Sequence, residues 1–230
     1  MFNDTLIIIP ARKGSVGLPG KNMKELNGKP LIKYTFDFVN QYLGDLPALV
    51  TTDSNEILDL ANMSGIEHNG PRPSHLSSAT SKTIDVVKHE LKFYDHSQIK
   101  RILLLQPTSP LRIKSDLTQM QELQMHFPDQ SIVSVTKVDE PHPYKMFVAD
   151  DEVLKPLITN STDMPRQTLP TVYFLNGMYY LINKTALLAN NSFTPPKCLP
   201  LFIEPDRSVN INNQLDFDLC EILMKKNLYV

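Results

Sequence analysis

The chain lacks tryptophan and has only two cysteines, Cys198 and Cys220, among its 230 residues. Two cysteines form no disulfide framework, and this pair lacks metal-ligand spacing, so we expect a reducing, cytoplasmic location. No charge of one sign dominates, because 23 basic and 25 acidic side chains leave a formal net charge of −2. A general nucleic-acid-binding protein needs a broad basic surface, so we expect no nucleic-acid partner. Local positive charge must hold any anionic ligand.

Long apolar runs are also missing. The opening run Leu6-Ile7-Ile8-Ile9 is too short for a membrane span or a signal peptide, and no basic segment precedes it. We therefore expect no membrane partner. Hydrophobic residues nevertheless make up 41% of the chain, which is enough for a sizeable core. The length suits a single α/β domain covering residues 1–230.

Strand-like and helix-like segments alternate up to about residue 138. We expect strands near residues 6–9, 48–52, 66–68, 101–105, 131–138 and 173–182, and helices near 30–40, 55–63, 83–94, 115–126 and 214–226. Such alternation predicts a mostly parallel, doubly wound sheet with helices on both faces. In these sheets, ligands bind beyond the carboxyl ends of the strands.

From about residue 140 the alternation stops. Five prolines, at positions 141, 143, 156, 165 and 170, separate short strand-like pieces. Proline is poorly tolerated inside helices and central strands. The segment 140–172 therefore looks like an inserted β-rich arm rather than another crossover helix.

A glycine-rich basic loop follows the first strand. Four of the eight glycines fall between residues 14 and 28, and Arg12, Lys13 and Lys21 supply three positive charges. Glycines bring backbone N–H groups close to an anion, so this loop suits phosphate oxygens. The spacing matches neither a P-loop nor a dinucleotide-binding fingerprint. The alternative is a mobile basic surface loop.

A rigid polar turn follows the apolar strand at residues 101–105. Pro107 and Pro110 restrict its backbone, while Gln106, Thr108 and Ser109 offer hydrogen-bond donors and acceptors. The alternative is a simple connector. We expect Arg112 to be structural, tying the turn to a neighbouring carboxylate. Both unusual loops lie at strand carboxyl ends, so we expect them to face one crevice.

From about residue 6 to residue 223, the chain resembles the acylneuraminate cytidylyltransferases, the CMP–sialic acid synthetases. The principal matching segments are Ile9-Pro10-Ala11-Arg12, Pro19-Gly20-Lys21-Asn22, Leu26-Asn27-Gly28-Lys29-Pro30-Leu31 and Leu105-Gln106-Pro107-Thr108-Ser109-Pro110-Leu111-Arg112. Further matches are Thr52-Asp53-Ser54, Arg72-Pro73, Thr83-Ile84-Asp85-Val86-Val87 with His89, Pro165-Arg166-Gln167 with Leu169-Pro170, and Asn176-Gly177 before Tyr179. Order and spacing agree throughout.

The resemblance implies a Rossmann-like nucleotidyltransferase fold whose arm, at about residues 140–172, serves dimerisation. It implies transfer of CMP from CTP to the anomeric hydroxyl of a nine-carbon acidic sugar, with release of pyrophosphate. The implied catalytic residues are Arg12, Lys21 and Gln106. The implied nucleotide-binding residues are Arg12, Lys13, Gly14, Ser15, Lys21, Asn22, Arg72, Ser81 and Thr83.

The sugar would contact Gln106, Lys145 and Arg166, and Phe193 matches an aromatic residue that reaches a neighbouring subunit's site in a homodimer. Arginine suits a carboxylate because its planar fork bonds both oxygens. Plainer alternatives remain open: Lys145 and Arg166 as solvated charges, and Phe193 as a core residue.

Three departures from the family pattern bear on the metal. Asn210 and Asn212 stand where relatives carry Mg²⁺-binding aspartates, so we expect Mg²⁺ or Mn²⁺ to be only weakly ligated by the protein. Val16 replaces a common lysine, and Lys13 is expected to supply that charge. Ala79 replaces a common aspartate. These changes leave two alternatives beside an active sialic-acid-type transferase: a CTP-binding homologue with impaired catalysis, or a cytidylyltransferase for another acidic or phosphorylated acceptor.

Overall fold

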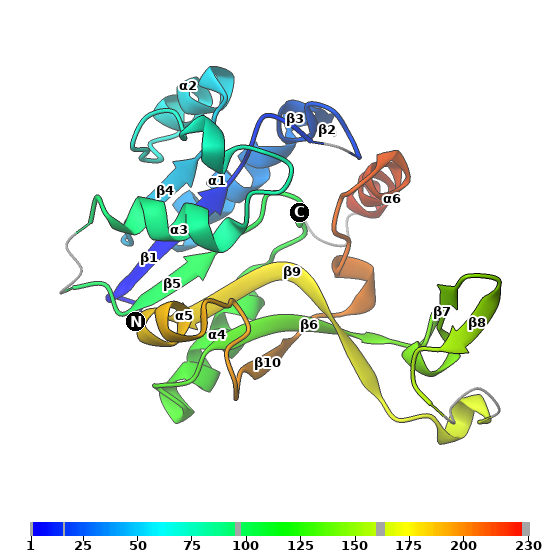
Figure 1. Cartoon of the computed structure of the whole chain (residues 1–230). Helices are drawn as coiled ribbons and strands as arrows, with labels where there is room; N and C mark the ends of the chain where they lie inside the picture. The colour runs from blue at the N-terminus through cyan, green and yellow to red at the C-terminus, as the bar shows by residue number, and fades with distance from the viewer. Residues whose placement is uncertain (1, 16, 95–97, 160–163, 227–230) are drawn as a thin grey trace.

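Six strands form the central sheet of the computed structural model, in the order β10-β6-β9-β5-β1-β4 (Figure 1). Their bounds are β1 Thr5–Pro10, β4 Ala48–Thr51, β5 Arg101–Leu104, β6 Ile132–Val138, β9 Val172–Asn183 and β10 Leu199–Phe202. β1 pairs in parallel with β4 and β5, and β10 with β6, whereas β9 is antiparallel to both its neighbours. The structure describes all residues except 1, 16, 95–97, 160–163 and 227–230.

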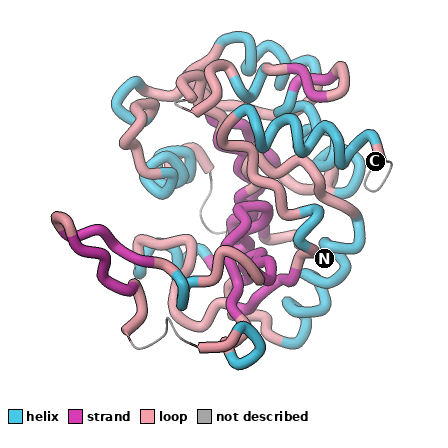
Figure 2. The backbone as a smooth tube through the Cα atoms, turned by 90° about the vertical axis from the view of Figure 1, so that its right-hand side faces the viewer, coloured by secondary structure: helices cyan, strands magenta, loops and turns pink. Residues whose placement is uncertain are grey.

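The sheet is doubly wound because alternate residues of β1 enter different cores. Ile7 and Ile9 pack into one hydrophobic cluster, and Leu6 and Ile8 into the other. α3 and α5 cover the second side, while α1, α4 and α6 contribute to the first (Figures 1 and 2). The helices are α1 Leu31–Tyr42, α2 Asn55–Met63, α3 Thr83–Leu91, α4 Lys114–His126, α5 Lys184–Asn190 and α6 Gln214–Lys225. The predicted mostly parallel α/β sheet is confirmed.

Several short elements differ from the sequence-based expectation. The strand expected at residues 66–68 is only an isolated bridge between Leu49 and Glu67. α5, β10 and the hairpin of β2 and β3 were not expected. β2 spans Glu25–Leu26 and β3 spans Lys29–Pro30. Elements of two to seven residues are too short for a periodic hydrophobic pattern to reveal them.

The arm leaves the sheet between β6 and β9. Its hairpin pairs β7 (Phe147–Asp150) with β8 (Val153–Pro156), and all eight residues are exposed. Figure 1 shows this hairpin at the lower right, well away from the helices that cover the sheet, and Figure 2 shows it projecting from the body. The insertion is β-rich, as expected.

Short 3₁₀ helices fill the loops. They are η1 Lys21–Met23, η2 Ser74–Leu76, η3 Pro143–Lys145, η4 Arg166–Thr168 and η5 Pro205–Arg207. Among the residues that the structure describes, no helix has both the length and the apolar character that crossing a membrane requires.

Candidate active site

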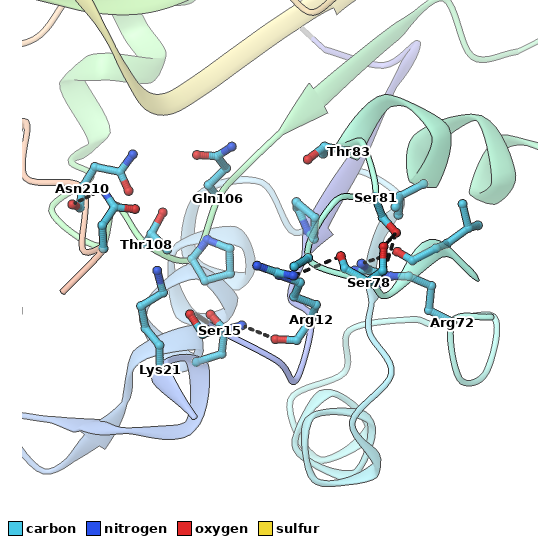
Figure 3. A pocket seen from close by; sticks show the side chains of 17 residues that line it. Arg12, Ser15, Lys21, Arg72, Ser78, Ser81, Thr83, Gln106, Thr108 and Asn210 are labelled. Atoms are coloured by element: carbon cyan, nitrogen blue, oxygen red, sulfur yellow. Dashed lines mark hydrogen bonds between the residues drawn. The ribbon is translucent and has the colours of Figure 1, made fainter. Parts of the chain in front are cut away.

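A pocket of about 320 Å³ lies where β1 and β5 end (Figure 3). We call it the strand-end pocket. Its walls come from the glycine-rich loop after β1, from residues 72–86, from the turn after β5 and from residues 210–212. Ten predicted site residues line it: Arg12, Ser15, Lys21, Asn22, Arg72, Ser81, Thr83, Gln106, Asn210 and Asn212. The two unusual loops therefore do face one crevice.

The glycine-rich loop is held in place by its own backbone groups. The Lys13 N–H donates to Asp53 Oδ1 at 2.6 Å, and Asn22 Nδ2 donates to the Arg12 carbonyl at 3.1 Å. A Cβ atom on Gly17 would lie 2.3 Å from the Asn212 carbonyl oxygen, so only glycine allows this close approach. Lys13 and Gly14 belong to the loop, but they are not among the described lining residues.

Lys21 joins the loop to residues 210–212. Its Nζ donates to the Ile211 carbonyl at 2.6 Å, and the Ile211 N–H donates to the Thr108 carbonyl at 2.8 Å. The main chain of Ile211 thus connects the glycine-rich loop with the turn after β5. Burial lowers the pKa of Lys21, and the charge of Arg12 lowers it further. A negatively charged ligand would relieve both effects.

Arg112 holds the turn that presents Gln106. This buried guanidinium donates to the Gln106 carbonyl at 2.7 Å, to the Met178 carbonyl at 3.0 Å and to Thr35 Oγ1 at 3.1 Å. The sequence predicted a structural role in which Arg112 binds a carboxylate. The role agrees, but the partners are carbonyl and hydroxyl oxygens. Burial lowers the pKa of Arg112 to about 10.

Gly177 lies against two pocket side chains. Its φ of 78° is in the left-handed region, and a Cβ atom there would lie 2.6 Å from Gln106 Oε1 and 3.0 Å from Asn210 Nδ2. The missing side chain thus lets Gln106 and Asn210 approach the backbone of β9. The sequence indicated Gly177 only through the family match.

The expected nucleoside side of the pocket is built around Arg72. This buried guanidinium donates to the Thr51 carbonyl, to Thr51 Oγ1 at 3.2 Å and to the Leu76 carbonyl at 3.4 Å. Burial lowers its pKa. Arg72 therefore stabilises the wall of the pocket as well as lining it.

A serine cluster completes this wall. Ser81 Oγ accepts from the Ser78 N–H at 3.1 Å and donates to the His75 carbonyl at 3.0 Å. Arg12 Nη1 reaches the same place, donating to the Ser78 carbonyl at 3.0 Å (Figure 3). Thr83 follows as the first residue of α3. Sequence reasoning missed Ser78, because a serine in a loop carries no spacing signal.

Three predicted sugar-site residues lie outside the strand-end pocket. Lys145 Nζ pairs with Glu140 Oε1 at 3.1 Å in the arm. Arg166 lines a separate pocket of about 220 Å³ at the base of the arm. Phe193 packs against Tyr180, with ring centroids 5.8 Å apart, beside the second hydrophobic cluster. Within one chain, the structure does not bring these residues to Gln106.

The residues at the expected metal position do not fit a cation held by the protein. Asn212 Nδ2 donates to the Asn210 carbonyl at 3.1 Å, and Asn210 Oδ1 is buried without a hydrogen-bond partner among the residues that the structure describes. Asp216 Oδ2 accepts the backbone N–H groups of Asn212 and Asn213 at 2.8 and 3.1 Å, which caps α6. Among described residues, no cluster of three or more His, Cys, Asp or Glu could hold a metal. Mg²⁺ prefers carboxylate oxygens.

The structure describes one of the other two departures from the family pattern, Ala79, but not the second, Val16. Ala79 lines the strand-end pocket, where its methyl group offers no charge. Val16 lies outside the described residues. The charge that Lys13 is expected to supply in its place stays a prediction.

Comparisons with known proteins agree with this geometry. A family model described as cytidylyltransferase matches residues 6–183. The chain is 31% identical to a CMP-N,N'-diacetyllegionaminic acid synthase of Legionella pneumophila, over 96% of this chain and 97% of that protein. It is 30% identical to an N-acylneuraminate cytidylyltransferase of Escherichia coli, over 99% of this chain but only 54% of that protein. Its fold resembles a CMP:2-keto-3-deoxy-manno-octonic acid synthetase complexed with CTP, with a TM-score of 0.71, 15% identity and coverage of 97% and 99%.

Proposed function

The chain belongs to the cytidylyltransferase family, and from this we propose that it transfers CMP from CTP to the anomeric hydroxyl of a nine-carbon acidic sugar, such as sialic or legionaminic acid. One observation carries the proposal. The strand-end pocket places Arg12 and Lys21, on the glycine-rich loop, opposite the rigid corner of Gln106 (Figure 3). A cationic loop facing a polar corner suits a polyphosphate and a hydroxylated acceptor.

The proposed reaction is a single displacement. The anomeric oxygen attacks the α-phosphorus, the new P–O bond forms, and the bond to the β-phosphate oxygen breaks to release pyrophosphate. Arg12 and Lys21 neutralise charge on the phosphates, and Gln106 orients the attacking hydroxyl. The hydroxyl proton passes to water at the open mouth of the pocket. No covalent intermediate with the protein is needed.

Each remaining nucleotide contact has a proposed role. Lys13, Gly14 and Ser15 form the part of the loop that is proposed to lie along the phosphates, with the backbone N–H groups of Gly14 and Ser15 as donors. Asn22, Arg72, Ser81 and Thr83 are proposed to contact the cytidine.

A second copy of the chain is proposed to complete the acceptor site. Lys145 and Arg166 lie in the arm, which projects from the body of its own chain (Figure 2). In a homodimer, the arm of one chain would bring these cations to the other chain's sugar carboxylate. Phe193 is proposed to reach the neighbouring site at the same interface. Exposed apolar side chains on β7 and β8 support the pairing.

The proposed location is the cytoplasm. Both cysteines are free, with Cys220 buried, which suits a reducing cytoplasm. CTP and an acidic sugar are the proposed ligands, and the proposal includes no nucleic acid or membrane. Mg²⁺ or Mn²⁺ is proposed to be held weakly, if at all, by protein atoms.

The experiment is a pyrophosphate-release assay with a panel of acceptors. CTP with sialic, legionaminic, pseudaminic and an eight-carbon ulosonic acid is tested with Mg²⁺ and with Mn²⁺. We expect release only when a nine-carbon acid is present. Lys21→Met should abolish it, while Lys24→Met, which changes a lysine outside the described pocket lining, should not. Absence of release with every nine-carbon acid contradicts the proposal.

A catalytically impaired CTP-binding homologue is the second candidate. The amide side chains of Asn210 and Asn212 favour it, because they remove the charged oxygens that Mg²⁺ prefers. Calorimetry would then show CTP binding without pyrophosphate release from any acceptor. An active acceptor in the panel excludes this candidate.

A further inference from the structure

Among its described lining residues, the strand-end pocket has three cationic side chains and no acidic one. Arg12, Lys21 and Arg72 line it, and the other described lining residues are neutral. A nucleoside triphosphate brings about four negative charges, which need neutralisation from the protein or from bound cations. Among the described lining residues, only the side chains of Arg12, Lys21 and Arg72 can supply that neutralising charge.

Two carboxylates touch the loops that build the pocket, and both are engaged elsewhere. Asp53 Oδ1 accepts the Lys13 backbone N–H at 2.6 Å and so orders the glycine-rich loop. Asp216 Oδ2 accepts the N–H groups of Asn212 and Asn213 at the start of α6. Neither carboxylate is among the described lining residues. These acids therefore stabilise the frame of the site.

The side-chain amides of Asn210 and Asn212 at the pocket wall do not form a set of oxygens suited to a cation. Asn212 directs its Nδ2 to the Asn210 carbonyl at 3.1 Å. Asn210 Oδ1 is buried, with no hydrogen-bond partner among the described residues, and the Nδ2 of the same amide lies beside Gly177. A hard divalent cation needs several oxygens arranged around it, and these two side chains do not supply them.

We infer that the strand-end pocket binds the nucleoside triphosphate without a divalent cation bound to the protein, since Arg12, Lys21 and Arg72 supply the positive charge. Any divalent cation then has only phosphate oxygens and water as ligands. The inference rests on the proposed function, because it describes how the same nucleotide is held. It goes further in separating nucleotide binding from metal binding.

Calorimetry of the full-length protein tests this directly. CTP is titrated in EDTA and again with Mg²⁺, and Mn²⁺ alone is followed by electron paramagnetic resonance. We expect the two CTP dissociation constants to agree within about threefold and free Mn²⁺ not to bind. CTP binding that needs a divalent cation, or Mn²⁺ binding to the protein alone, overturns the inference but leaves the proposed function standing. No CTP binding under either condition overturns both.

A variant that introduces negative charge adds a second test. Asn210→Asp with Asn212→Asp places two carboxylates at the pocket wall, so metal-free CTP affinity should fall by about tenfold or more, and Mg²⁺ should restore it. Asn213→Asp is the matched control, because aspartate keeps the cap of α6 and residue 213 lies outside the described lining. An unchanged metal-free affinity in the double variant contradicts the inference.

Discussion

Gly177 determines where two pocket side chains lie. Its left-handed backbone and its missing Cβ atom leave room for Gln106 Oε1 and Asn210 Nδ2. Any larger residue would move Gln106, the side chain proposed to orient the attacking hydroxyl. Small displacements of a positioning group have large effects on rate, because attack requires aligned atoms.

Gly177→Ala should therefore lower kcat/KM for the acceptor by about 10- to 100-fold while leaving CTP affinity nearly unchanged. Steady-state kinetics and calorimetry measure the two quantities. Gly65→Ala is the matched control: its φ of 69° imposes similar backbone strain, but no atom lies within 4 Å of the new Cβ. An equal loss of activity in both variants would show that strain alone is responsible.

The buried ammonium of Lys21 predicts the pH dependence of nucleotide binding. Its pKa in the free protein is lowered by burial and by Arg12. The group is charged below that pKa and loses its charge as the pH rises through it. CTP affinity should then weaken at a pH below the ordinary lysine range.

Lys21→Arg should extend binding to higher pH, because a guanidinium keeps its proton. Dissociation constants measured across the alkaline range check this, with Lys24→Arg as the control for a lysine outside the described pocket lining. Identical profiles for Lys21→Arg and the unchanged protein would refute the assignment.

Asp116 connects three elements, α4, β9 and η5, through buried hydrogen bonds. At the start of α4, it accepts two bonds from Arg207 of η5, at 2.9 and 3.0 Å, and one from the Tyr179 hydroxyl of β9 at 3.0 Å. The side chains of Asp116 and Arg207 are 0% and 3% exposed. Removing one partner of a buried pair leaves an uncompensated charge.

Asp116→Asn should lower the free energy of unfolding by about 3 kcal/mol or more. Glu204→Gln, which removes the exposed partner of the same arginine, should cost less than about 1 kcal/mol. Urea denaturation of both variants gives the comparison. If the two losses are similar, Asp116 does not hold these elements together.

The sequence predicted the central sheet and both pocket loops, because β1 and β5 each contain an apolar run, at residues 6–9 and 102–104, and unusual polar residues follow each strand. The sequence could not predict that the Ile211 main chain joins Lys21 to Thr108, since this depends on segments 190 residues apart in sequence. It also misassigned the partners of Arg112. A sequence can indicate that an arginine near a turn is structural, but it does not show which carbonyl groups surround that arginine.

The arm leaves the molecule with apolar surface that its own chain does not cover. Phe147, Val153 and Leu154 are 47%, 61% and 66% exposed on the β7–β8 hairpin. Exposed apolar residues gathered on one projecting hairpin indicate an interaction surface. A second copy of the chain is the proposed partner, and its arm would carry Lys145 and Arg166 to the acceptor.

Leu154→Glu should shift the protein from dimer to monomer and weaken acceptor use, because it places a charge in the proposed interface. Sedimentation velocity and acceptor kinetics measure both effects. Met63→Glu, at a methionine on α2 that is 79% exposed, should change neither. A monomeric unaltered protein with full activity would exclude the role of the arm.

At Ile211 the tie uses only the peptide N–H and carbonyl groups, while Lys21 contributes its side-chain Nζ. No substitution there other than proline removes the donor or the acceptor, so the spacing between the nucleotide loop and the acceptor corner does not depend on which side chain occupies that position. Side chains around the tie are then free to diverge. Enzymes of this architecture could thus acquire new sugar preferences over time while the geometry of phosphate transfer is inherited unchanged.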